Sequence, residues 1–194
     1  MSPSGPPTAE IAAGETLHRI HADANEARFY GRKDATWRWD DPAHQYGALY
    51  LGLTQIGPFA ETLLRRPQQR AVVWSEINKR RFACFRTLRR LRLADIHGAG
   101  LSWFGVSVAQ IAADHDEKTF PGAYETTQAI SALVHKQTTL DGIQYRSRLD
   151  TDHFCVALFE RADAAMELVN EGTLIDRTWV DEMLEPRGRH IVDL

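Results

Sequence analysis

The sequence has only two cysteines, Cys84 and Cys155, and each lies inside a short apolar run that is typical of a strand. Two cysteines are too few for the disulfide framework that staples small secreted domains. Buried cysteine packs like a small hydrophobic residue. We therefore expect both thiols to be buried and reduced, and we choose neither as a nucleophile.

Long apolar runs and excess charge are also missing. No run approaches the length of a membrane-spanning helix, and the amino terminus lacks the basic and apolar parts of a signal peptide. The 23 Lys and Arg residues face 26 Asp and Glu, for a formal net charge of -3. This balance predicts neither general nucleic-acid affinity nor an acidic tail. We expect a cytoplasmic protein that does not bind membranes.

Several motifs of common chemistries are absent. No Gly-x-Gly-x-x-Gly fingerprint follows a predicted strand, which disfavours a dehydrogenase that recycles NAD. No glycine-flanked nucleophile elbow surrounds Ser147, so hydrolysis by a serine nucleophile is disfavoured. His18 and His21 have a spacing that faces one side of a helix, not of a strand, and no third ligand accompanies them. No metal site is predicted.

At 194 residues the chain is long enough for one well-buried core, and no composition shift argues for a second one. Residues 1–12, rich in Pro, Ser and Gly near their start, are expected to form a flexible lead-in to a single domain over 13–194. Further helices are expected at 101–113, 123–135 and 161–169. About six or seven short strands and four or five helices fit an α+β chain.

The stretch Trp37–Glu61 is the most informative part of the sequence. Arg38 lies between two tryptophans and before an Asp-Pro turn. The apolar run 48–53, which includes Tyr50, predicts a buried strand, and Pro58 suits the first turn of a following helix, where we also place Glu61. Short connections keep consecutive elements close in space. We expect a guanidinium, a phenol and a carboxylate to lie near one another.

A second informative stretch covers 140–150. Asp141-Gly142 predicts a turn, and Ile143 and Tyr145 alternate as in a strand that ends near Ser147. The apolar run 153–159 predicts a central strand. A serine at a strand end is more often structural than functional, so Ser147 alone carries no assignment.

Two charged segments have alternative interpretations. Seven basic residues lie between 79 and 92: Lys79, Arg80, Arg81, Arg86, Arg89, Arg90 and Arg92. Their density is compatible with nucleic-acid binding, but apolar residues at core positions of two strands alternate with them, which favours a solvated face. The acidic residues at 114–117 are likewise expected to form a solvated loop.

Taken together, these motifs resemble the RES domain family. The resemblance rests on Arg38 with its Asp-Pro turn, the strand with Tyr50, Glu61 in Phe-Ala-Glu-Thr-Leu, and Gly-Ile-Gln-Tyr-Arg-Ser-Arg at 142–148, and it covers residues 15–165. The family is named for an arginine, a glutamate and a serine, which here would be Arg38, Glu61 and Ser147. Many members have two glycines just before the arginine, where this chain has Ala35-Thr36-Trp37.

The resemblance implies an ADP-ribosyltransferase-like α+β fold with a mostly antiparallel, split β core flanked by helices. It also implies an enzyme that consumes NAD as a substrate, with no other cofactor. The family's members are known as toxins of bacterial toxin–antitoxin pairs, and their usual partner is an Xre-type antitoxin with a helix-turn-helix domain. A homodimer within such a complex is a further expectation, and direct nucleic-acid binding is not expected.

The residues can be given roles on this basis. Arg38, Glu61 and Ser147 are the expected catalytic residues, and Arg19, Arg38, Tyr50 and Tyr145 the expected NAD-binding residues. The fork of Arg38 suits a phosphate, and Glu61 would stabilise positive charge on the ribose as a carboxylate does in glycoside hydrolysis. Tyr50 would offer a ring face or a hydroxyl, and Ser147 would position Glu61 or the ribose.

Three functions stay open. The first is a toxin that depletes NAD by hydrolysis or phosphorolysis. The second uses the same site to transfer ADP-ribose to a protein. The third is a non-catalytic module that binds nucleic acid or protein through the basic segment 79–92.

Overall fold

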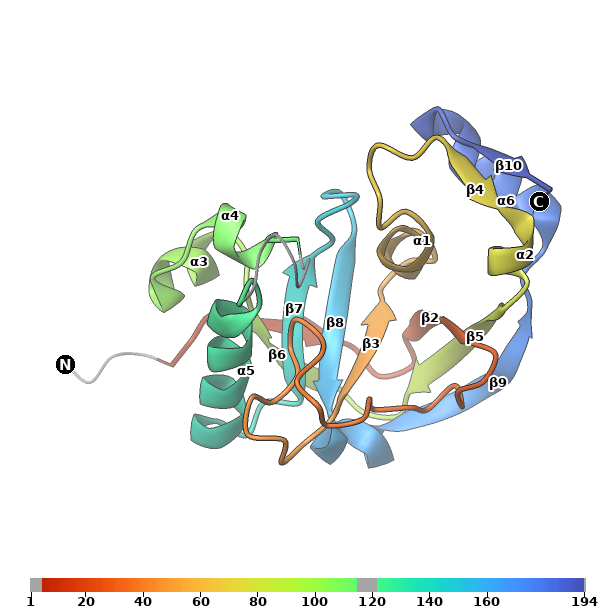
Figure 1. Cartoon of the computed structure of the whole chain (residues 1–194). Coiled ribbons are helices and arrows are strands. Elements are labelled where there is room, and N and C mark those ends of the chain that lie inside the picture. Colours follow the sequence, from red (N-terminus) through yellow and green to blue (C-terminus); the bar gives the residue numbers. More distant parts are fainter. Residues whose placement is uncertain (1–4, 115–121, 194) are drawn as a thin grey trace.

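The structure, a computed structural model, describes residues 5–114 and 122–193 (Figure 1). Its strands are β1 (Thr8–Ile11), β2 (Thr16–Ala22), β3 (Ala48–Gly52), β4 (Ala71–Val73), β5 (Arg80–Thr87), β6 (Leu91–Asp95), β7 (Gly142–Arg146), β8 (Phe154–Phe159), β9 (Met166–Leu174) and β10 (His190–Val192). Its helices are α1 (Ile56–Leu63), α2 (Trp74–Ile77), α3 (Ala99–Phe104), α4 (Val108–Ile111), α5 (Glu125–Gln137) and α6 (Arg177–Leu184), with 3-10 helices η1 (Glu160–Ala165) and η2 (Glu185–Arg187).

Eight strands form one curled sheet in the order β1-β6-β7-β8-β3-β2-β5-β9. All neighbours in it are antiparallel except β6 and β7, and β10 pairs with β4 in a separate parallel ribbon. Strands β2 and β3 share a single paired position, His18 with Gly52, so the sheet divides between them. The expected α+β class, with a mostly antiparallel split sheet flanked by helices, is confirmed.

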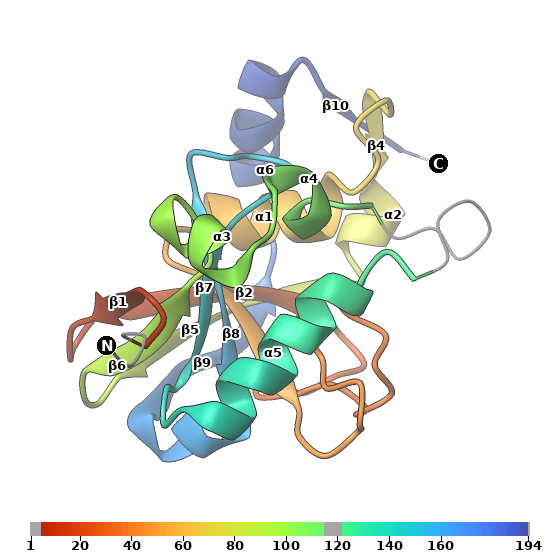
Figure 2. The same cartoon turned by 90° about the vertical axis from the view of Figure 1, so that its left-hand side faces the viewer.

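One face of the sheet is covered by helices. Ile130 and Val134 of α5 pack with Ile143 of β7 and Ala157 of β8, and Figure 2 shows α5 lying across this face. Helix α1 lies on the same face over β2, β3 and β8 and shares a second core cluster with α6. In the view of Figure 1, α5 lies to the left of the β7–β8 pair and α1 to its right.

The other face of the sheet packs against the segment that precedes β3. Leu49, Leu51, Val156 and Leu158 point to this side and form a core with Ala27 and the η1 helix. Alternate residues of β3 and β8 thus belong to two different cores, as the period of two in a strand requires. The central apolar runs are therefore buried on both faces.

A glycine fixes how α1 leaves the sheet. A Cβ at Gly52, the last residue of β3, would lie 2.2 Å from Cδ of Pro58 and 2.8 Å from the Thr54 carbonyl oxygen. Only a residue without a side chain allows the chain to turn back so closely. The predicted strand-to-helix unit is confirmed, but α1 begins at Ile56, so Glu61 lies in its second turn and not in the first.

Four sequence predictions of local structure are wrong. No turn forms at Asp141-Gly142, because Gly142 is the first residue of β7, which runs parallel to β6. The lead-in 1–12 is too long, because β1 pairs with β6 through Thr8–Ile11. The helix expected at 101–113 is two short helices, since Gly105 takes a left-handed φ of 66° that ends α3. The helix expected at 161–169 is η1 followed by β9, whose alternating burial marks an edge strand.

Both cysteines are free, in β5 and β8; Cys155 is buried as predicted, whereas Cys84 is only half-buried. Burial raises the pKa of the Cys84 and Cys155 thiols, and the Glu61 carboxylate raises that of Cys155 further. Within the described ranges, the helices are too short and too polar for any of them to cross a bilayer.

A buried carboxylate joins β6 to β7. Asp141 is 7% exposed at its side chain and accepts two hydrogen bonds from Arg89, at 2.9 and 2.7 Å, and one from the Arg92 backbone N–H at 2.9 Å. Burial alone would raise the pKa of Asp141, but these donors outweigh it and lower the pKa. The folded protein therefore favours the ionised form.

We expect Asp141→Asn to lower the free energy of unfolding by roughly 1–3 kcal/mol at pH 7, because charged hydrogen bonds are lost. Since folding lowers this pKa, the stabilisation is complete above the unfolded value of about 4 and is lost as the pH falls through the folded value. Urea denaturation from pH 7 to pH 3 should show the wild-type advantage shrinking. The exposed control Asp152→Asn should have little effect, and a pH-independent difference for Asp141→Asn would contradict this account.

Candidate active site

A hydrogen-bonded turn presents Arg38. The Asp40 carboxylate accepts the Trp37 backbone N–H at 2.9 Å and the Tyr50 hydroxyl at 2.9 Å, and that hydroxyl in turn accepts the Trp39 N–H at 2.9 Å. Burial raises the pKa of Tyr50 and of Asp40. The turn at 37–40 is thus anchored to β3.

Helix α5 holds the same turn from the other side. The Gln128 side chain donates to the carbonyl oxygens of Ala35 and Trp37 at 2.6 and 3.0 Å, and the Ser131 hydroxyl donates to that of Trp39 at 2.7 Å. Ala35 has a left-handed φ of 56°, a conformation that glycine adopts without a steric cost. The backbone on both sides of Arg38 is therefore fixed by side chains about ninety positions away along the chain.

Arg38 is buried, with 7% of its surface exposed. Its Nη2 donates to the Ala113 carbonyl oxygen at 3.0 Å, and its guanidinium lies 5.1 Å from the centre of the Tyr124 ring. Its Nη1 is buried with no hydrogen-bond partner among the described residues. A buried donor without a partner costs free energy unless a ligand satisfies it.

Glu61 and Ser147 are in direct contact. The Ser147 hydroxyl, which is fully buried, donates to Oε1 of Glu61 at 2.7 Å, and the Arg148 backbone N–H donates to the same oxygen at 3.2 Å. Within the described residues, Oε2 of Glu61 accepts no hydrogen bond. The carboxylate is therefore held by one oxygen, and the other is available to a ligand.

Tyr145 lies between these two parts. Its ring is 5% exposed and 5.3 Å from that of Trp39. Burial raises the pKa of Tyr145, the Glu61 carboxylate raises it further, and the Arg38 guanidinium lowers it. Arg38 and Arg148 contact the successive residues Ala113 and Asp114, and the Arg148 backbone N–H donates to Glu61. The structure thus brings Arg38 near the Glu61–Ser147 pair, with Tyr145 packed mainly in the core.

Tyr50 also belongs to this group, but its hydroxyl has a different task from the one expected. Its only proton is donated to Asp40, and its oxygen already accepts the Trp39 N–H. The hydroxyl is therefore engaged in holding the turn. A ribose hydroxyl would have to displace one of these bonds, so only the ring face of Tyr50 remains for a ligand.

Arg19 is not brought together with the other candidates. On β2 it pairs with Ala83 and shares a face with Leu17, in the core opposite the one that Tyr50 contacts. It is 8% exposed, and burial lowers its pKa to about 10. The period of two in a strand directs it away from the group, contrary to the expected second anchor.

Neither of two cavities elsewhere on the molecule includes the group. A cavity of about 180 Å³ lies between β9 and α6, lined by Phe82, Leu174 and Trp179 among others. Another of about 490 Å³ lies near Pro6, Arg92 and Lys136. At the candidate site, the segment Ala113–Asp114 lies against the arginine donors instead.

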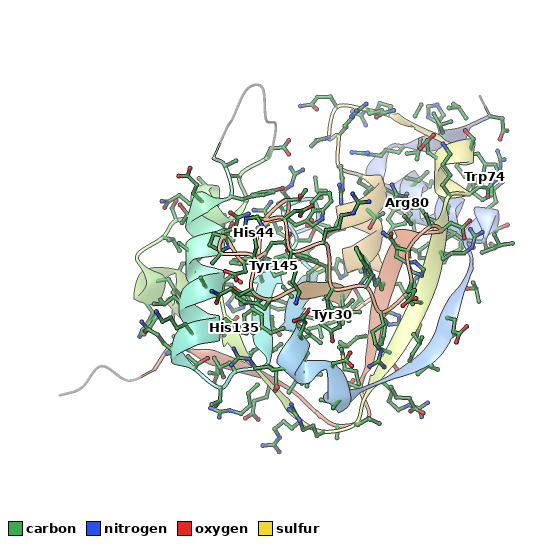
Figure 3. The ribbon with its side chains drawn as sticks, turned by 60° about the horizontal axis from the view of Figure 1, so that its bottom comes forward. Tyr30, His44, Trp74, Arg80, His135 and Tyr145 are labelled. Carbon is green, nitrogen blue, oxygen red and sulfur yellow. The ribbon has the colours of Figure 1, made fainter. Side chains whose placement is uncertain are left out.

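Most charges of the basic segment are engaged in ion pairs. Five of its residues are in ion pairs: Lys79–Glu76, Arg81–Asp23, Arg86–Glu167, Arg89–Asp141 and Arg90–Glu10. Figure 3 shows Arg80 beside Trp74, on the far side of the molecule from His135 of α5. Because its charges are spread and largely paired, the segment gives little support to a nucleic-acid-binding module.

Sequence reasoning missed several residues of the site. Asp40, Gln128 and Ser131 hold the turn of Arg38, and Asp114 forms an ion pair with Arg148 at 2.8 Å. The other residues of the acidic cluster, 115–117, lie outside the described residues. Gln128 and Ser131 lie one turn apart on α5, so a polar pair on the inner side of a helix was the available signal.

Comparison with known families identifies the family of the chain. The family model of the RES domain matches residues 16–180, most of the chain. The chain belongs to the RES family. The arginine, glutamate and serine that the resemblance selected are Arg38, Glu61 and Ser147, which this RES protein brings into one group.

Structural comparison agrees with the fold of this RES protein. A chain in the crystal structure of the M. tuberculosis MbcT–MbcA toxin–antitoxin complex superposes with a TM-score of 0.67 and 14% sequence identity. The match covers 91% of this chain and 92% of that chain. At this identity, the likeness establishes a shared fold. No curated protein matches the sequence.

The turn of Arg38 should depend on α5. Ser131→Ala removes the donor to the Trp39 carbonyl and the partner of the Tyr46 hydroxyl, 2.7 Å from the serine Oγ. We expect a loss of roughly 1–3 kcal/mol in the free energy of unfolding, since buried polar groups lose their partners. Chemical denaturation beside the exposed control Ser102→Ala measures it, and equal stability of the two variants would refute the role of Ser131.

Proposed function

We propose that this RES protein is the toxin of a toxin–antitoxin pair and that it degrades NAD by cleaving the bond between nicotinamide and ribose. The observation that carries the proposal is that Arg38, with its unpartnered buried Nη1, and Glu61, held by Ser147, are linked through Ala113–Asp114 and Arg148. Family membership supports the same reading. Water or inorganic phosphate would accept the ADP-ribosyl group.

The reaction asks little covalent chemistry of the protein. When the bond from the ribose C1′ to the pyridinium nitrogen breaks, both electrons pass to nicotinamide, which leaves as a neutral molecule. The sugar then carries positive charge, as in glycoside hydrolysis. A preorganised carboxylate beside C1′ lowers the barrier most, because it interacts with charge that develops only in the transition state.

The geometry fits this requirement. The Ser147 hydroxyl and the Arg148 backbone N–H fix Oε1 of Glu61 at 2.7 and 3.2 Å, so Oε2 would face the sugar. The Nη1 donor of Arg38 would bind a phosphate oxygen of the dinucleotide. Water attacking C1′ would give ADP-ribose and a proton. Attack by phosphate would give ADP-ribose 1″-phosphate.

The toxin part of the proposal rests on family membership and on the fold shared with a chain of a toxin–antitoxin complex. The partner we propose is an Xre-type antitoxin with a helix-turn-helix domain. Expression of this chain alone should arrest bacterial growth and lower cellular NAD. Co-expression with the product of an adjacent reading frame of that type should restore both, and arrest with unchanged NAD would reject NAD depletion.

Glu61→Gln keeps the shape of the side chain and removes its charge. We expect the rate of nicotinamide release from NAD to fall on the order of 10²–10³-fold, as when a transition-state electrostatic contact is removed. Liquid chromatography of the products measures the rate. The melting temperature should change by no more than about 2 °C. The Gln side chain still offers Oε1 to the Ser147 hydroxyl and the Arg148 N–H, so the free energy of unfolding should change little.

The matched control is Glu171→Gln, an exposed position on β9. It should leave turnover unchanged. Equal turnover by Glu61→Gln and wild type would exclude the proposed role of Glu61. If labelled NAD leaves its label on a macromolecule, the same site transfers ADP-ribose to a protein and does not deplete NAD.

Arg38→Lys tests phosphate binding separately from chemistry. An ammonium retains the charge but not the fork, so the Michaelis constant for NAD should rise about tenfold or more, with a smaller change in kcat. Steady-state kinetics beside Arg86→Lys, a surface substitution on β5, give the comparison. An unchanged Michaelis constant would assign Arg38 to structure alone.

A further inference from the structure

Two arginines of the site are joined by one dipeptide. Arg38 donates from Nη2 to the Ala113 carbonyl oxygen at 3.0 Å. Nη2 of Arg148 forms an ion pair with Oδ1 of the next residue, Asp114, at 2.8 Å. Arg38 precedes β3 and Arg148 follows β7. Figure 1 shows α4 at the same end of the sheet as the loop after β7. The dipeptide therefore bridges the site from one side to the other.

The ion pair between Arg148 and Asp114 is uneven. The Arg148 side chain is 14% exposed, whereas that of Asp114 is 55% exposed. An exposed carboxylate keeps much of its hydration, so its contribution to such a pair is small and easily replaced. A largely buried guanidinium, in contrast, has few alternatives to an anionic partner. The asymmetry marks Arg148 as the fixed member and Asp114 as the exchangeable one.

The surroundings of Arg148 add positive potential. Its Nη2 also lies 3.4 Å from the Arg65 carbonyl oxygen, and the Arg65 guanidinium stacks 4.8 Å from the Trp37 ring. Burial lowers the pKa of Arg65, and the Arg148 guanidinium acts in the same direction. Two cations held close together, with an exposed carboxylate as the ion-pair partner of one, favour an additional anion.

The position of Arg148 is fixed relative to the reacting carboxylate. Its backbone N–H donates to Oε1 of Glu61 at 3.2 Å, and the preceding Ser147 donates to the same oxygen. A phosphate bound by the Arg148 side chain would thus have a fixed position relative to Glu61. The Ala113 carbonyl and the Asp114 carboxylate are anionic or polar groups on successive residues, and each contacts one of the two arginines. The two phosphates of a dinucleotide would contact the arginines in the same way.

We infer that Arg148 is a second phosphate-binding residue of the site, and that the Ala113–Asp114 segment occupies the pyrophosphate position until a dinucleotide displaces it. The inference rests on the proposed function, because it concerns the same site. Arg38 and Arg148 each bind one phosphate of the pyrophosphate, and Asp114 is a competing internal anion. Asp114 therefore weakens substrate binding in the wild-type protein.

The test uses ADP-ribose, which contains the pyrophosphate but not the scissile bond, with the full chain in phosphate-free buffer. Arg148→Ala should weaken ADP-ribose binding in calorimetry about tenfold to a hundredfold, as for loss of a charged hydrogen bond. Asp114→Asn should tighten it about twofold to fivefold, the value of an exposed ion pair. When Arg148→Ala is already present, Asp114→Asn should tighten ADP-ribose binding much less.

Controls separate charge and folding from the specific contact. Arg148→Lys keeps the charge and should retain part of the affinity, and melting temperatures identify any variant that has not folded. Arg86→Ala and Asp181→Asn change charge on the surface of β5 and α6 and should leave binding unchanged. If inorganic phosphate alone binds at Arg148, ADP-ribose affinity will not respond to Arg148→Ala, and the inference falls.

The two proposals fail separately. Absence of nicotinamide release by the wild-type protein rejects NAD cleavage, whatever Arg148 binds. Normal cleavage with ADP-ribose affinity unchanged in Arg148→Ala, or unchanged or weakened in Asp114→Asn, overturns the inference and leaves the proposed function intact. No binding of ADP-ribose by the wild-type protein also overturns it.

Discussion

The site depends on the burial of one carboxylate. Asp40 is 3% exposed, and its two oxygens each accept one hydrogen bond, from the Trp37 N–H and from the Tyr50 hydroxyl. Burying an unpaired carboxylate would be prohibitive, so these bonds are needed for the fold as well as for the site. Because Arg38 lies between Trp37 and Asp40, the same bonds that satisfy Asp40 fix the backbone from which the Arg38 side chain extends. The structural requirement and the functional one coincide at this turn.

Unlike Asp40, other residues of the group keep polar atoms that have no hydrogen-bond partner among the described residues. Arg38 keeps one buried donor without a partner among the described residues, and Glu61 keeps one oxygen that accepts no hydrogen bond from those residues. Interior polar groups are paired in nearly all cases, and exceptions concentrate where a ligand completes the pairing. A cation and an anion that remain incompletely paired, linked through Ala113–Asp114 and Arg148, form an arrangement suited to a ligand with phosphates at one end and developing positive charge at the other.

Much of the local structure could be predicted. The apolar runs at 48–53 and 153–159 are strands because they are buried on both faces, and Gly57-Pro58 begins a helix because proline suits its first turn. The η1–β9 segment could not be predicted in the same way. Ala162, Ala165 and Met166 have a spacing compatible with a helix, and their burial against the sheet, a tertiary contact, decides where the chain becomes extended.

The sequence by itself determined the chemistry: which arginine, glutamate and serine to examine, and the strand–turn–helix unit that carries two of them. Only the tertiary structure decided which groups meet. The face of β2 that carries Arg19 follows from its pairing with β5, the hydroxyl of Tyr50 is engaged by Asp40, and Arg148 contacts Asp114 from a distant segment. The physical reason is that hydrogen bonds and ion pairs form between neighbours in space, and spacing along the chain fixes neighbours only within one helix or strand.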